Sequence, residues 1–165
     1  MSDYIRNFQT KNIDQQLTTD TSAYATGDVL VATVAVPLLG ATIGDSVRVK
    51  IEQISVVDKD ANSGAFDIVI LDDNKSLGTI NAAVSISDAD GLSVVKVLNV
   101  TSSNYNTLTS GGQTVANIDL AAPIYVQTQP ASGSIYIGLI SRDSKTYTAS
   151  ALYLRMAVQF VDRSA

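Results

Sequence analysis

Apolar and polar residues alternate along several stretches of the chain, and the first clear example begins at Val47. From Val47 to Ile51 every second residue is apolar, which is the period of two typical of a half-buried β-strand. After Gln53 the apolar positions shift by one residue, to Ile54 and Val56. An extra residue in one strand exchanges its two faces, so we predict a β-bulge near Gln53.

The most complete alternation in the chain runs from Leu152 to Phe160. One face carries Leu, Leu, Met, Val and Phe, and the other carries Tyr, Arg, Ala and Gln. A stretch this regular fits a strand with one face in the core and one face outside. We predict that it is a central strand of a sheet.

Further strand candidates follow one another, with turn sequences between them. The polar cluster from Asp58 to Gly64 separates the first strand from alternating residues 66–71, which predicts a hairpin over about residues 50–70. The other candidate strands are residues 77–80, 83–86, 92–100, 115–120, 124–127 and 135–141. A short helical turn is expected near residues 88–92, and a polar loop over residues 102–112.

About eight to ten strands, with turn signals every 8–12 residues, are typical of a sandwich or barrel. We predict an all-β fold: a single-domain β-sandwich, jelly-roll-like, with antiparallel strands over residues 17–165. The composition agrees, because 47 of the 165 residues are Val, Ile or Thr, whose branched side chains fit a pleated sheet. The chain also has 15 Asp but one Glu, which favours turns over helices.

Residues 1–16 lack a sustained alternation and are predicted to form an N-terminal arm. Large apolar side chains at Tyr4, Ile5 and Phe8 accompany Arg6, on a segment too short to bury them by itself. We therefore expect the arm to dock on a neighbouring molecule, with Tyr4, Ile5, Arg6 and Phe8 as partner-binding residues.

The residue types exclude much of enzyme chemistry. The chain has no His and no Cys, so imidazole bases, thiolate nucleophiles and zinc or iron–sulfur sites built from these residues are absent. We expect no catalytic residues, no cofactor and no metal. The net charge is −5 without a basic cluster, so we expect no nucleic-acid partner. The sequence has no apolar run of about 20 residues and no signal-peptide core at its start, so we expect no membrane partner.

Asp-rich turns are the remaining candidates for chemistry. The loop from Asp58 to Gly64 has Asp, Asp and Asn at alternate positions, but the Gly and Glu that a calcium loop needs are missing. We interpret it as a turn stabilised by its own side chains. Paired carboxylates could serve a glycosidase, and Asp72/Asp73 and Asp88/Asp90 are the candidates, but both pairs lie in turn sequences without flanking aromatic residues.

The chain resembles small virion structural proteins of tailed bacteriophages in three stretches: LTTDTSAYATGDVL (17–30), AFDIVILDDNKSLGTINAAVSISDAD (65–90) and YIGLISRDSKTYTASALYLRMAVQF (136–160). The resemblance includes a closing hairpin, ISR…YTAS…L, and runs from about Leu17 to Phe160. It implies a capsid decoration or cement protein: a β-sandwich on the outside of the head, made in the host cytoplasm, that fastens neighbouring major capsid subunits. Such proteins are commonly homotrimers.

Charged residues make up only 16% of the chain, compared with roughly 25% in soluble domains, which indicates a surface partly covered by partners. The expected partners are the major capsid protein and further copies of the chain. Two alternatives stay open at this point. One is a structural component of the tail or baseplate, and the other is a carbohydrate-binding module on the virion surface.

Overall fold

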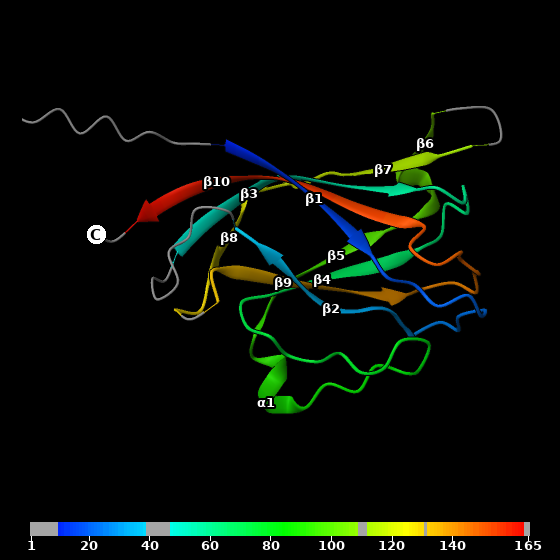
Figure 1. Ribbon diagram of the computed structural model, residues 1–165, viewed down its shortest axis with the longest axis horizontal. Helices are drawn as coiled ribbons and strands as arrows, with labels where there is room; N and C mark the ends of the chain where they lie inside the picture. Colours follow the sequence, from blue (N-terminus) through cyan, green and yellow to red (C-terminus); the bar gives the residue numbers. More distant parts are fainter. Residues whose placement is uncertain (1–9, 39–46, 109–111, 131, 164–165) are drawn as a thin grey trace, which may run out of the picture.

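Ten strands in two antiparallel sheets form a β-sandwich in the computed structural model, which describes residues 10–38, 47–108, 112–130 and 132–163 (Figure 1). The predicted all-β sandwich is confirmed. No helix within these ranges has both the length and the apolar character needed to cross a membrane.

Sheet 1 has the strand order β1-β10-β3-β7-β6, and β8 pairs with the N-terminal part of β3. Its strands are β1 (Thr10–Leu17), β3 (Val47–Asp58), β6 (Tyr105–Thr107), β7 (Thr114–Ile118), β8 (Ile124–Gln127) and β10 (Leu152–Arg163). Sheet 2 has the order β2-β9-β4-β5. Its strands are β2 (Val29–Pro37), β4 (Phe66–Leu71), β5 (Val94–Val100) and β9 (Ser134–Ser141). Two helical turns complete the described fold, α1 (Asp88–Gly91) and the 3-10 turn η1 (Ser102–Asn104).

The strand order is that of a jelly roll. With the short strands β6 and β8 set aside, β1-β10-β3-β7 faces β2-β9-β4-β5. The described chain crosses from one sheet to the other between β1 and β2, β2 and β3, β3 and β4, β5 and β6, β8 and β9, and β9 and β10. This double Greek-key arrangement closes a core between the inner faces of the two sheets.

Two predicted hairpins are wrong. The strands before and after the loop of residues 59–65, β3 and β4, belong to different sheets, and so do β9 and β10 at the closing hairpin that the resemblance implies. In each case the connection crosses from one sheet to the other instead of turning back in the same sheet. Alternation reports which residues face the core, but both a hairpin and a crossing loop satisfy the same pattern.

The prediction of a central strand at residues 152–160 is confirmed. β10 pairs with β1 on one side and with β3 on the other. Its inward residues are Leu152, Leu154, Met156 and Val158, and each is at most 2% exposed. The predicted bulge is also present, because Ala157 faces Gln53 and Val158 faces Ile51, which leaves Glu52 without a partner in the ladder.

Residues 10–16 belong to the sandwich, which corrects the predicted boundary of the arm at residue 16. They form β1 together with Leu17 and pair with β10 from Thr10, opposite Gln159, to Leu17, opposite Leu152. Ile13 and Leu17 are buried in the core between the sheets. The alternation is hard to recognise in the sequence because the other inward positions, 11 and 15, carry Lys and Gln and are half-buried at the rim. The remainder of the predicted arm, residues 1–9, lies outside the described residues.

Residues 72–93, which we call the strap, connect β4 to β5 and lie over the outer face of sheet 2 (Figure 1). The strands predicted at residues 77–80 and 83–86 are wrong, since the strap makes only single bridges to residues 28 and 29. Its apolar residues instead build a second core with the outer face of sheet 2. Leu77 is the centre of this core, and a Cβ on Gly138 of β9 would lie 2.4 Å from its Cδ1. The predicted helical turn is present as α1, with Ser87 as its N-cap.

Shortening Leu17 tests whether β1 is part of the core. We expect Leu17→Ala to lower the free energy of unfolding by about 2–5 kcal/mol, because the side chain is fully buried and its removal leaves a cavity. Gln16→Ala in the same strand is the control and should change stability by less than about 0.5 kcal/mol, since Gln16 is exposed. Urea unfolding followed by circular dichroism measures both values, and equal effects would mean that β1 is not anchored.

Candidate interaction surfaces

The four predicted partner-binding residues, Tyr4, Ile5, Arg6 and Phe8, lie outside the described residues. Three regions of the described chain carry the other features that bear on function: a loop cluster at one end of the sandwich, the outer face of sheet 1, and the side of the molecule next to β5.

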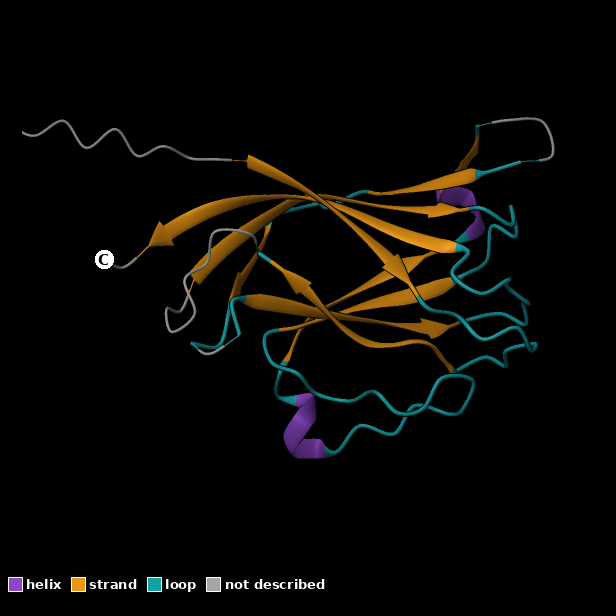
Figure 2. Ribbon diagram, viewed as in Figure 1, coloured by secondary structure: helices purple, strands orange, loops and turns teal. Residues whose placement is uncertain are grey.

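The loop cluster gathers the connections after β1, β3 and β9 at one end of the sandwich (Figure 2). Asp58, at the end of β3, is completely buried. Its two oxygens accept hydrogen bonds from the backbone N–H groups of Asp60 and Ser63, both at 2.9 Å. The Asp60 carboxylate in turn accepts from the Thr148 N–H and hydroxyl. The predicted self-stabilised turn is confirmed, and it also fastens the β3–β4 crossing to the β9–β10 crossing.

Two tyrosines close this cluster from the inside. The Tyr105 hydroxyl donates to the Gly64 carbonyl at 3.0 Å. The Tyr147 hydroxyl lies so close to Gly64 that a Cβ there would be 2.2 Å from it, so no other residue fits at position 64 without moving Tyr147. Burial raises the pKa of both tyrosines far above the ordinary value, which keeps them protonated at every physiological pH.

Burial also raises the pKa of Asp58, although the hydrogen bonds from Ser63 and Asp60 act in the opposite direction. The folded protein therefore binds a proton at Asp58 more readily than the unfolded chain does. Nowhere in the described part of the chain do three or more Asp or Glu side chains converge as a metal site would require. The oxygens of Asp58 and Asp60 are occupied by protein donors.

The two other predicted carboxylate pairs belong to the strap. Lys75 lies between them, with its ammonium 3.3 Å from Asp73 and 3.5 Å from Asp90. The hydrogen bond with Asp73 raises the pKa of Lys75, so this cation stays charged. Asp90 also accepts a hydrogen bond from Ser87, which caps α1. These contacts connect the start of the strap to its helical turn. The carboxylates therefore stabilise the conformation of the strap.

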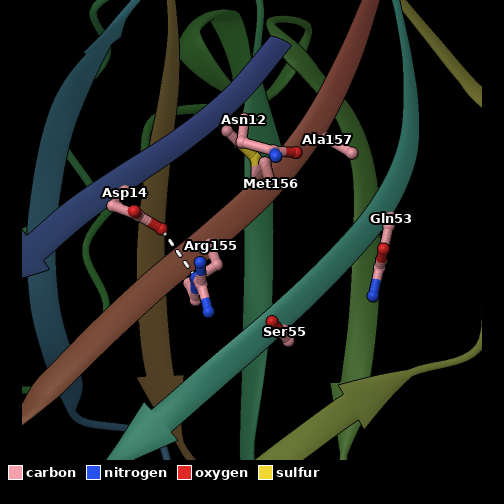
Figure 3. Close-up of a pocket in the computed structure, with 7 residues that line it drawn as sticks. All are labelled: Asn12, Asp14, Gln53, Ser55, Arg155, Met156 and Ala157. Carbon is pink, nitrogen blue, oxygen red and sulfur yellow. Dashed lines mark hydrogen bonds and ion pairs between the residues drawn. The ribbon is translucent and has the colours of Figure 1, made fainter. Parts of the chain in front are cut away.

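The outer face of sheet 1 carries a shallow polar depression of about 200 Å³ (Figure 3). Figure 3 labels the residues of three neighbouring strands that line it: Asn12 and Asp14 of β1, Gln53 and Ser55 of β3, and Arg155, Met156 and Ala157 of β10. The side chain of Met156 itself belongs to the core. Ala157 lies between its strand partners Asn12 and Gln53. Because its side chain is small, the surface is lowest at this position. Arg155 donates from Nε to Asp14 at 2.7 Å. The depression can offer amide, hydroxyl and guanidinium groups to a polar ligand.

A larger groove, of about 500 Å³, lies between β5 and residues 118–125. We call it the β5 groove. One wall is made by residues 95–99 of β5, and the other by the end of β7, the loop of residues 119–123 and the start of β8. Val95, Val97 and Tyr125 line it and are 38%, 47% and 48% exposed. In the described chain β4 is the only strand paired with β5, so one backbone edge of β5 is open.

Sequence reasoning did not identify the β5 groove. The run from Leu92 to Val100 is predicted to be a strand, but a strand with valines on both faces looks the same whether it is central or at an edge. The signal that was available is the tripeptide Ala121-Ala122-Pro123, because Pro after two small residues favours an irregular, exposed connection.

No protein-family model matches the chain, and no curated protein matches its sequence. Among solved structures, the chain is similar to one from "Structure of infectious bursal disease virus Gt strain", with 11% sequence identity and a TM-score of 0.22. The match covers 95% of this chain and 43% of that chain, so this chain spans less than half the length of the other. A likeness at this TM-score carries no weight for fold or function.

Replacing Asp58 with Asn tests the buried carboxylate. Asn keeps the size of the side chain but loses one acceptor, so we expect Asp58→Asn to cost about 1–3 kcal/mol of stability at pH 7. Because the pKa of Asp58 is raised by folding, its contribution is fully present below the unfolded-state pKa and is lost as pH rises through the folded-state pKa.

The stability difference between the two proteins should therefore widen as the pH is lowered from 7 toward 3. Urea unfolding at several pH values measures it. A difference that narrows in acid would show that the pKa of Asp58 is lowered instead.

Proposed function

We propose that this protein is a non-enzymatic structural component of a tailed-phage virion, where it binds the outside of the head and stabilises contacts between major capsid subunits. The observation that carries the proposal is the jelly-roll strand order, an architecture shared by viral capsid domains and by lectins. Architecture alone does not define function, so this support is an analogy at the level of the fold. The resemblance of residues 17–160 to tailed-phage virion proteins selects the capsid role from among these possibilities.

The chemistry of the described chain supports a role in contact. The carboxylates that sequence analysis singled out hold loops together or pair with Lys75. The chain has no His or Cys that could serve as a base or nucleophile. What the surface offers is a rigid sandwich, an open strand edge and a polar sheet face. These are the parts that a cement protein needs.

In this proposal the protein is made in the host cytoplasm and assembles as a homotrimer on the capsid exterior. Its partners are the major capsid protein and further copies of itself, without nucleic acid, membrane or cofactor. Tyr4, Ile5, Arg6 and Phe8 are the proposed partner-binding residues, because they place three large apolar side chains ahead of β1. A position in the tail or baseplate is the alternative within the same class.

A carbohydrate-binding module is the second candidate, and the polar depression on sheet 1 favours it. Asn12, Gln53 and Arg155 provide amide and guanidinium groups that can bind sugar hydroxyls. Tyr153 is also on this face of β10, but Lys59 stacks on its ring at 4.0 Å. A glycan array distinguishes the candidates, since saturable binding that Asn12→Ala abolishes would support the carbohydrate function.

Mixing the purified protein with undecorated heads tests the capsid role. We expect ordered density on the outside of the shell in cryo-electron microscopy, and weaker occupancy when Tyr4 and Phe8 are both changed to Ser. Leu108→Ser is the control, because Leu108 is a large apolar residue that is 59% exposed and lies outside the proposed contacts. Density on the tail of intact virions would support the alternative location, and no density on either part would contradict a virion role.

A further inference from the structure

We propose that the β5 groove receives residues 1–9 of a second copy of this chain, which add to sheet 2 as an extra strand along β5. The inference deepens the homotrimer proposed above by naming the contact that holds the copies together, and it rests on that proposal. It concerns contacts between copies and makes no use of the capsid.

The first support is the open edge of β5. An edge strand presents unpaired N–H and C=O groups that readily pair with another chain, and proteins usually protect such edges with charges, Pro or bulges. β5 has the sequence VVKVLNV, with Lys96 as its one charge and no Pro. It has one bulge, at Val95, and its ladder with β4 is regular from Lys96 to Val100. The strap packs on the outer face of sheet 2, and no described residue of it pairs with β5. The edge is therefore suited to strand addition.

The second support is the concentration of exposed apolar side chains beside that edge. The large hydrophobic residues exposed in the described chain are Leu92, Val95, Val97, Leu108 and Tyr125. Three of these five line the β5 groove: Val95, Val97 and Tyr125. Leaving them in water is unfavourable, so the groove favours an occupant that brings apolar side chains as well as backbone hydrogen-bonding groups.

Residues 1–9, MSDYIRNFQ, have the chemistry that the groove requires. They contain no Pro, so each N–H after the first residue can join a ladder. In an extended strand Tyr4, Arg6 and Phe8 share one face, which gives two aromatic anchors with a cation between them. The groove wall contains Asp119, which complements Arg6, and Lys96, which complements Asp3.

The register of sheet 1 favours a second copy over the same chain as the donor. Thr10, Gln159, Lys50 and Tyr125 form one row across β1, β10, β3 and β8. Thr10, at the start of β1, thus lies three strand spacings, or about 14 Å, from Tyr125, where the groove begins on this side. Phe8 is two residues from Thr10 and can reach only about 7 Å along the chain.

Within one molecule, Phe8 would therefore fall short of the groove, and only about residues 1–5 could reach it. In a second molecule, Tyr4, Ile5 and Phe8 can all enter it. The contact is heterologous, because each copy donates a segment at one place and accepts one at another. Such a contact closes into a ring when the rotation between copies allows it, and a trimer is one closed form.

The oligomeric mass of the isolated protein is the first test, measured by size-exclusion chromatography with light scattering. We expect a trimer for the full chain, and monomers both for a form lacking residues 1–9 and for Val97→Lys. Leu108→Lys is the matched control, because it places the same charge at an exposed apolar residue outside the groove and should remain trimeric. Circular dichroism confirms that each variant is folded.

A labelled peptide of residues 1–9 is the second test. It should bind the form lacking residues 1–9, and Val97→Lys in that form should weaken binding by at least about tenfold, whereas Leu108→Lys should not. The inference is overturned if the shortened form keeps the trimeric mass, or if the peptide binds the Val97→Lys form equally well. A full chain that is monomeric until it meets heads would also overturn it, while decoration of those heads would still support the proposed function.

Discussion

The placement of β10 between β1 and β3 is the constraint on which the rest of the molecule depends. β10 forms one ladder with β1 and another with β3, and its inward residues fill the centre of the core. Without it, β1 would have no partner and sheet 1 would be divided. β2, β4 and β9 each follow a strand of sheet 1 and pack opposite that sheet. Their positions therefore depend on sheet 1 being continuous.

Much of the fold could be predicted from the sequence, because a period of two in the apolar residues reports which face of a strand is buried. The stretches beginning at Val47, Phe66 and Leu152 are strands for that reason, and the phase shift near Gln53 marks a real bulge. Pairing could not be predicted in the same way. The loop after Asp58 has the composition of a tight turn, but its hydrogen bonds to the β9–β10 crossing make it a bridge between the sheets.

The candidate sites were less accessible to sequence reasoning than the strands. Asp72, Asp73, Asp88 and Asp90 are conspicuous in the sequence, but in space they serve the strap or its helical turn. The β5 groove has no sequence signature, since it arises where the edge of one sheet meets a loop of the other. The strap is a further reason. Its apolar residues pack on the outer face of sheet 2, so that face is buried although the sequence predicts separate strands there.

The jelly-roll order also has a consequence for how the chain folds. β1 finds its partner in β10, more than 130 residues later in the sequence, and the central sheet is complete only when that last strand arrives. When such distant segments come together, the chain loses conformational entropy before stabilising contacts form. Folding is therefore expected to be slow for a domain of this size. While β10 is still being synthesised, β1 and β3 expose unpaired edges and one side of the core. The newly made chain is then vulnerable to aggregation, and chaperones would act during that interval.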